Sequence, residues 1–113
     1  YGSSNYGKIK EVKLANGGTV RVKFRIYITG TASLAARIYV NGSPVGAERL
    51  FQGDGGSLSP IFVEDIEVNK GDLLQIYGKR IEGSGSLHIR DFEILVGSPN
   101  DIVVKTFEYY NND

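Results

Sequence analysis

The chain contains no cysteine, no methionine and no tryptophan, and a single histidine, in 113 residues. Without cysteine it can form no disulfide, no thiolate metal site and no cysteine nucleophile. It has no apolar run near the roughly 18 residues that a membrane span needs, so we expect no span. Because it begins at Tyr1 and not at methionine, we expect either a processed amino terminus, as after removal of a secretory signal, or a fragment boundary.

Neither sign of charge is in excess. Lys and Arg together number 13, as do Asp and Glu, so the formal net charge is zero. Nucleic-acid-binding domains usually carry a basic excess on one face, and we therefore expect no nucleic-acid partner. A chain without net charge repels its own copies little, which leaves self-association unopposed.

Alternation is the pattern that the chain does contain. Between Thr19 and Thr29, apolar residues occupy every second position and polar residues the positions between. A period of two is that of an extended strand with one face in water. The apolar members are Val20, Val22, Phe24, Ile26 and Ile28, and the polar members are Arg21, Lys23, Arg25 and Tyr27.

Similar segments, cut by Gly and Asn turns, fill the rest of the chain, and Asn41-Gly42 is a strong signal for a tight hairpin. They are Lys8–Leu14, Leu34–Val40, Ser43–Leu50, Ile61–Val68, Leu73–Arg80, Ser86–Val96 and Ile102–Tyr110. About eight strands predict an all-β fold, an antiparallel two-sheet sandwich that is jelly-roll-like and not immunoglobulin-like. We expect an N-terminal arm over residues 1–7 and a single β-sandwich domain over residues 8–113.

The alternation slips once, near Arg90–Asp91. Leu87 and Ile89 have one parity, whereas Phe92 and Ile94 have the other. An extra residue in a strand, a β-bulge, would bring all four onto one face. The sequence therefore predicts a bulge at this point.

The residues that usually carry catalysis are few. His88 lies in mid-strand, and no Gly-x-Ser-x-Gly nucleophile elbow accompanies it. Two strand carboxylates can form a glycosidase pair, but we interpret the acidic strand residues as solvated positions that face Lys and Arg across the sheet. These residues are Glu64, Asp65, Glu67, Asp91 and Glu93. We predict that the protein is not an enzyme and has no cofactor.

Calcium is the one metal for which the loops offer ligands. Asp54, Asp72 and Asp101 each lie beside Gly or Asn, and calcium needs six to eight oxygens. The Gly-rich loop around Asp54 lacks the alternating Asp spacing of a calcium loop, so we interpret these residues as turn formers. The same loop lacks the strand-to-helix context and the Lys of a phosphate-binding loop.

The 7 tyrosines are the unusual excess. Exposed Tyr beside Arg is common at interfaces and on sugar-binding surfaces, so Tyr27, Tyr39 and Tyr77 with Arg25 are a candidate ligand platform. Aromatic residues in polar termini usually pack on something, either on the same subunit or on a neighbour. The candidate assembly residues at the two ends are Tyr1, Tyr6, Ile9, Val103, Phe107, Tyr109 and Tyr110.

Three segments carry a family resemblance. They read Ala-Arg-Ile-Tyr-Val-Asn-Gly-Ser-Pro-Val-Gly at residues 36–46, Val-Glu-Asp-Ile-Glu-Val-Asn-Lys-Gly-Asp-Leu-Leu-Gln-Ile-Tyr at 63–77 and His-Ile-Arg-Asp-Phe-Glu-Ile at 88–94. Their order resembles β-sandwich modules of phage tail-fibre and virion-surface proteins and of other secreted microbial structural proteins. The "strand, Asn-Gly, strand" pieces are also similar to tumour-necrosis-factor-like and carbohydrate-binding jelly rolls. Such families imply extracellular binding or assembly.

The sequence thus predicts a non-enzymatic structural subunit of an extracellular or virion assembly, a filament or fibre. Its partners would be copies of itself, which associate through open sheet edges and the terminal segments. The alternative is a carbohydrate- or receptor-binding module of a host-recognition fibre, whose partner is a cell-surface glycan or receptor. Both place the protein outside the cell or on a virion surface.

Overall fold

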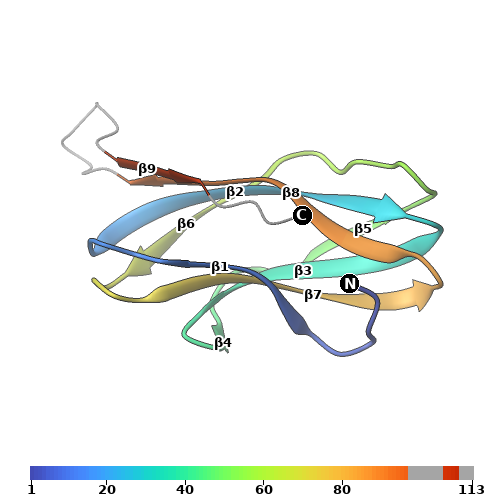
Figure 1. Ribbon diagram of the computed structural model, residues 1–113, viewed down its shortest axis with the longest axis horizontal. Helices are drawn as coiled ribbons and strands as arrows, with labels where there is room; N and C mark the ends of the chain where they lie inside the picture. Colours follow the sequence, from blue (N-terminus) through green and yellow to red (C-terminus); the bar gives the residue numbers. More distant parts are fainter. Residues whose placement is uncertain (97–105, 110–113) are drawn as a thin grey trace.

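The computed structural model describes residues 1–96 and 106–109, with side chains through Leu95. The described residues form strands and no helix, arranged in two antiparallel sheets, so the predicted two-sheet sandwich is confirmed. Figure 1 views the sandwich from its side, with β2 and β8 in the upper layer and β3 and β7 in the lower one.

The lower layer, sheet A, has the order β1-β7-β3-β4, and β5 also pairs with β3. Its strands are β1 (Gly7–Lys13), β7 (Leu73–Gly83), β3 (Ala32–Val40), β4 (Ser43–Pro44) and β5 (Arg49–Gly53). The upper layer, sheet B, has the order β6-β2-β8-β9, with β6 (Phe62–Val68), β2 (Gly18–Thr29), β8 (Ser86–Val96) and β9 (Thr106–Tyr109). The chain passes between the sheets at most of its turns, a feature shared with jelly rolls.

One predicted strand is divided in two. The segment expected to run unbroken over Ser43–Leu50 forms β4 and β5, which pair with β3 separately. Between them the N–H groups of Val45 and Gly46 both donate to the Ile38 carbonyl, at 3.0 and 3.1 Å, so the chain bends out of the ladder there. The predicted Asn41-Gly42 turn is present, with φ angles of 51° and 83°.

The core lies between the sheets and follows the alternation read from the sequence. All five apolar residues predicted to share one face of Thr19–Thr29 are at most 1% exposed. They pack against aliphatic residues of β3 and β7, including Leu34, Ile38, Leu74 and Ile76. The amphipathic pattern therefore sets which face of each sheet turns inward.

The predicted β-bulge is confirmed. Arg25 of β2 pairs with Arg90 and Lys23 pairs with Glu93, so Asp91 and Phe92 together lie opposite a single residue of β2. Asp91 takes a positive φ of 54°. The extra residue allows Phe92 to turn inward, where it is 1% exposed.

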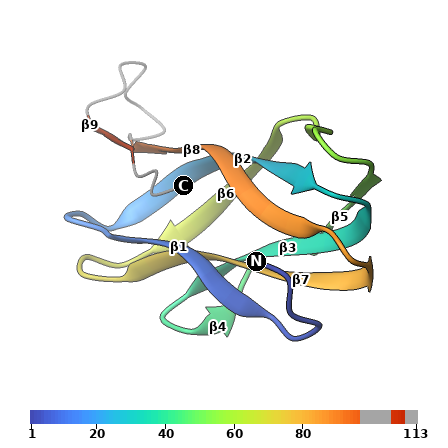
Figure 2. The same cartoon turned by 45° about the vertical axis from the view of Figure 1, so that its right-hand side comes forward.

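The first residues of the chain lie on their own subunit. The Leu87 N–H donates to the Tyr1 carbonyl and the Arg80 N–H donates to the Ser3 carbonyl, both at 2.7 Å. Because Leu87 belongs to β8 and Arg80 to β7, these residues bridge sheets A and B along one side of the sandwich (Figure 2). Tyr1 and Ser3 thus bond within their own subunit, and contact of the terminal tyrosines with a neighbouring copy stays a prediction.

Candidate functional site

Two of the four predicted platform residues come together, on the outer face of sheet A. The rings of Tyr39 and Tyr77 stack, with centroids 3.9 Å apart and planes 9° from parallel. Tyr6 lies against Tyr39 with a centroid distance of 6.0 Å. The Tyr6 hydroxyl donates to Glu48 Oε2 at 2.5 Å, and Lys79 Nζ lies 4.7 Å from the centre of the Tyr6 ring.

This cluster uses its aromatic faces internally. Each ring of the stacked pair covers one face of the other, and Lys79 lies over the Tyr6 ring, so these faces are taken by contacts within the subunit. Burial, and then the hydrogen bond to Glu48, raise the pKa of Tyr6 above its usual range, so the phenol stays neutral. The cluster ties the residue before β1 to the surface of sheet A.

The other two predicted platform residues, Tyr27 and Arg25, lie on the opposite outer face, that of sheet B. The Arg90 guanidinium lies 4.2 Å from the centre of the Tyr27 ring, and the His88 ring lies 6.2 Å from it. Arg25 Nε is 3.2 Å from Asp91 Oδ2. The predicted platform is therefore divided between two faces of the molecule.

The predicted assembly residues also have different surroundings. Tyr1 pairs with β8, Tyr6 belongs to the aromatic cluster, and Ile9 packs against the core. Phe107 and Tyr109 lie in β9, whose backbone pairs with β8. Val103 and Tyr110 lie outside the described residues.

Three of the five acidic strand residues, Asp65, Asp91 and Glu93, pair with Arg or Lys of the same sheet as the cross-strand interpretation requires, whereas Glu64 and Glu67 have other partners. Asp65 accepts two hydrogen bonds from Arg21, at 2.9 and 3.2 Å, and they lower the pKa of its carboxyl. Glu64 accepts from Arg49 Nη2 at 3.2 Å, and this ion pair joins β6 of one sheet to β5 of the other. The remaining partners are Lys23 for Glu93, Arg25 for Asp91 and Thr19 for Glu67.

The two loop aspartates that the structure describes serve turns. Asp72 accepts from the Asn69 N–H at 2.8 Å and from the Asn41 side chain at 3.0 Å, and these bonds lower its pKa. Asp54 accepts from Thr31 Oγ1 at 3.3 Å. Asp101 lies outside the described residues. Within the described ranges no group of three or more His, Asp or Glu side chains could hold a metal ion, and calcium binding stays untested.

Exposed aliphatic side chains concentrate in the segment of the chain that holds the edge strands β5 and β6, with Leu50 on the outer face of sheet A and Val63 on that of sheet B. Of the seven large hydrophobic residues that are exposed in the described chain, five fall within residues 45–63, so the exposure is local. We call this surface the β5–β6 side. It consists of Val45, Leu50, Leu58, Ile61 and Val63.

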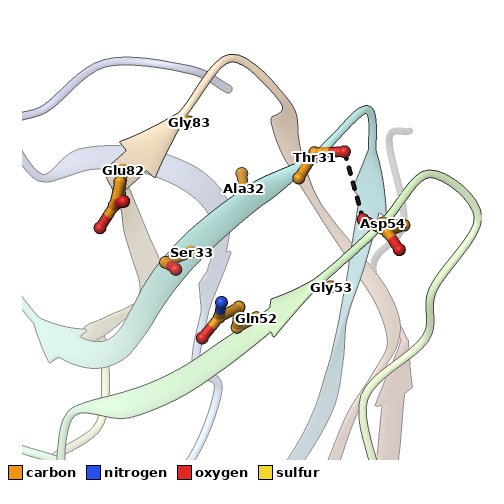
Figure 3. Close-up of a pocket in the computed structure, with 8 residues that line it drawn as sticks. All are labelled: Thr31, Ala32, Ser33, Gln52, Gly53, Asp54, Glu82 and Gly83. Carbon is orange, nitrogen blue, oxygen red and sulfur yellow. Dashed lines mark hydrogen bonds between the residues drawn. The ribbon is translucent and has the colours of Figure 1, made fainter.

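A polar hollow lies at one end of sheet A, on its outer face (Figure 3). Its volume is about 420 Å³, and its lining comes from the ends of β3, β5 and β7. The polar side chains that line it are Thr31, Ser33, Gln52, Asp54 and Glu82. A second hollow of about 320 Å³ adjoins it and shares Ser33 and Gln52, with Leu50 and Ile81 as apolar walls.

No family model, curated protein or solved structure matches this chain. The resemblance to virion-surface modules therefore stays a prediction, and the fold rests on the structure itself. In the part of the chain that the structure describes, no helix is long and apolar enough to cross a membrane.

Sequence reasoning missed both the β5–β6 side and the hollows. The sequence did contain a signal for the β5–β6 side. Val63 and Leu50 are large apolar residues, and the residues on either side of each of them in its strand are less exposed than they are. Several large apolar residues at water-facing positions of neighbouring strands usually mark an interaction surface. The hollows had no such signal, since they depend on which strands the topology places together.

Proposed function

We propose that this protein is a non-enzymatic structural subunit of an extracellular or virion assembly and that it self-associates through the β5–β6 side. The observation that carries the proposal is that five exposed aliphatic residues fall within residues 45–63, the segment that holds the two open-edged strands β5 and β6. Exposed apolar residues scattered singly need no explanation, but a local group of them along strand edges usually marks an interaction surface.

The backbone of this side is suited to pairing with another chain. Over the described residues β6 pairs only with β2, and β5 only with β3, so each has an open edge. Proteins usually protect such edges with charged side chains, above all Lys, or with Pro; β6 has no Lys or Pro, but it does carry three acidic residues. Only Arg49 reaches part of this edge, through a 3.4 Å hydrogen bond from Nη2 to the Val63 carbonyl.

The electrostatics of the side do not oppose contact between copies. Asp65 and Glu64 of β6 are neutralised by Arg21 and Arg49 of the same subunit. The formal net charge of the whole chain is zero. A second copy would therefore meet aliphatic side chains and an open strand edge with little long-range repulsion.

Sedimentation velocity over a range of protein concentrations, with negative-stain microscopy at the highest one, tests the proposal. We expect the wild-type protein to form oligomers, rods or rings. The double variant Ile61→Lys/Val63→Lys should remain a monomer, because it places two cations on the open edge.

Ala15→Lys/Asn16→Lys is the matched control, since it places two cations in the exposed turn between β1 and β2, outside the β5–β6 side. It should associate like the wild type. A wild-type protein that stays monomeric at every concentration, or a double variant that assembles normally, would overturn the proposal.

A further inference from the structure

Beyond assembly, we infer that the two adjoining hollows on the outer face of sheet A form a binding site for a neutral mono- or disaccharide. The site is separate from the aromatic cluster and from Tyr27. The inference does not rest on self-association, because only Leu50 belongs to both surfaces.

The site begins with three polar side chains in one row across three strands. In the sheet register Ser33 of β3 pairs with Gln52 of β5 on one side and with Glu82 of β7 on the other. All three lie on the outer face, because the flanking residues Ala32 and Leu34 turn into the core. The small Ser33 in the centre leaves space between the two longer side chains, and this space is the hollow in Figure 3.

These three side chains have no hydrogen bond or ion pair with any other described residue. Two charged residues on the outer faces illustrate the opposite case. Lys79 pairs with Glu48 on sheet A, and Arg21 pairs with Asp65 on sheet B. A row of polar groups left open side by side inside a concave surface is the feature that points to a ligand.

The mixture of groups selects the class of ligand. The Glu82 carboxylate accepts hydrogen bonds, the Ser33 hydroxyl both donates and accepts, and the Gln52 amide does the same. A ligand that satisfies all three must itself carry several groups that donate and accept, as the hydroxyls of a sugar do. The aliphatic walls Leu50 and Ile81 offer contact for the C–H face of a sugar ring.

A cationic ligand fits this lining less well. The two carboxylates lie on opposite walls, Glu82 at the end of β7 and Asp54 after β5, and Asp54 already accepts a bond from Thr31 (Figure 3). They therefore do not converge on one positive group. The volumes of about 420 and 320 Å³ fall at the lower end of the range of small-molecule sites, which suits one or two sugar rings.

Titration of ¹⁵N-labelled protein with maltose, cellobiose and lactose, followed by NMR, tests the inference. We expect at least one of these probes to shift the amide signals of residues 31–33, 52–54 and 82–83. The variant Gln52→Ala should bind it about three- to tenfold more weakly, which is the usual effect of one lost hydrogen bond. Ser33→Tyr should abolish binding by filling the hollow.

Thr19→Tyr is the control, because Thr19 lies on the outer face of the other sheet. It should bind as the wild type does. L-Arginine amide is the comparison ligand, and shifts of the same amides by it alone would overturn the inference in favour of a cationic partner. Absence of shifts with every saccharide, or unchanged binding by Ser33→Tyr, would also overturn it.

Discussion

At the scale of single residues, Gly83 shows how closely the chain packs at one end of the sandwich. It adopts a φ of +92°, and a Cβ added to it would lie 2.5 Å from the Thr31 carbonyl oxygen. The turn after β7 therefore depends on glycine for two separate reasons, a left-handed conformation and a close approach to the start of β3. Gly42 has a similar φ of +83° but nothing within 4 Å of its added Cβ.

This difference allows the two effects to be separated by substitution. Gly42→Ala should lower the free energy of unfolding by about 1–2 kcal/mol, the cost of a left-handed conformation for a residue with a Cβ. Gly83→Ala should lower it by a further ~1–3 kcal/mol, because Thr31 or the turn must move. Urea denaturation of both variants measures the difference, and equal losses would show that the chain relaxes freely at Gly83.

The sequence predicted which side chains are buried where a pattern repeats along a strand, and it failed where the position of a side chain depends on a single contact. Alternation over Thr19–Thr29 predicted the inward residues correctly because burial acts on every second position. The same rule gives no reason for Lys10 to be buried, yet Lys10 is 1% exposed beside a register shift in β1. The alternation rule also could not assign Tyr27 to one outer face and Tyr39 and Tyr77 to the other, since this assignment depends on which strands form each sheet.

At the scale of elements, the bulge in β8 sets the register of sheet B. Removing one residue from it should restore strict alternation, with Ile89, Phe92 and Ile94 still facing inward. The bulge could be predicted from the sequence, because the apolar residues shift from odd-numbered positions, Leu87 and Ile89, to even-numbered positions, Phe92 and Ile94. The strand order was not, because hydrogen-bonded neighbours such as β2 and β8 are far apart in the sequence.

Deletion of Asp91 should therefore be tolerated. The protein loses the ion pair with Arg25, which is worth at most about 1 kcal/mol at a partly exposed position, but keeps its core. Deletion of His88 in the same strand should cost about 2–5 kcal/mol, because either Leu87 or Ile89 must then turn outward. Urea denaturation and the dispersion of NMR amide signals compare the two. Similar losses for both deletions would contradict this account of the bulge.

At the scale of the whole molecule, the two lateral sides of the sandwich differ. On one side Tyr1 and Ser3 bond to β8 and β7 and so bridge the sheets. On the other side Arg49 and Glu64 bridge them, but the strand edges and the aliphatic residues around them remain open. The terminal aromatic residues that the sequence offered for assembly are partly used within the subunit, and the sequence predicted assembly through open sheet edges without indicating which strands form them. Assembly through the termini and assembly through the β5–β6 side are thus distinct hypotheses.

Deletion of residues 1–5 distinguishes assembly through the N-terminal segment from assembly through the β5–β6 side. The truncated chain loses three hydrogen bonds, two with Leu87 and one with Arg80, and its free energy of unfolding should fall by about 1–3 kcal/mol. It keeps Tyr6 and the whole β5–β6 side, so it should still associate to the same extent as the wild type in sedimentation velocity. If it becomes monomeric while its unfolding free energy is unchanged, the N-terminal segment acts between subunits and not within one. The Ile61→Lys/Val63→Lys variant should show the opposite pattern, with stability retained and association lost.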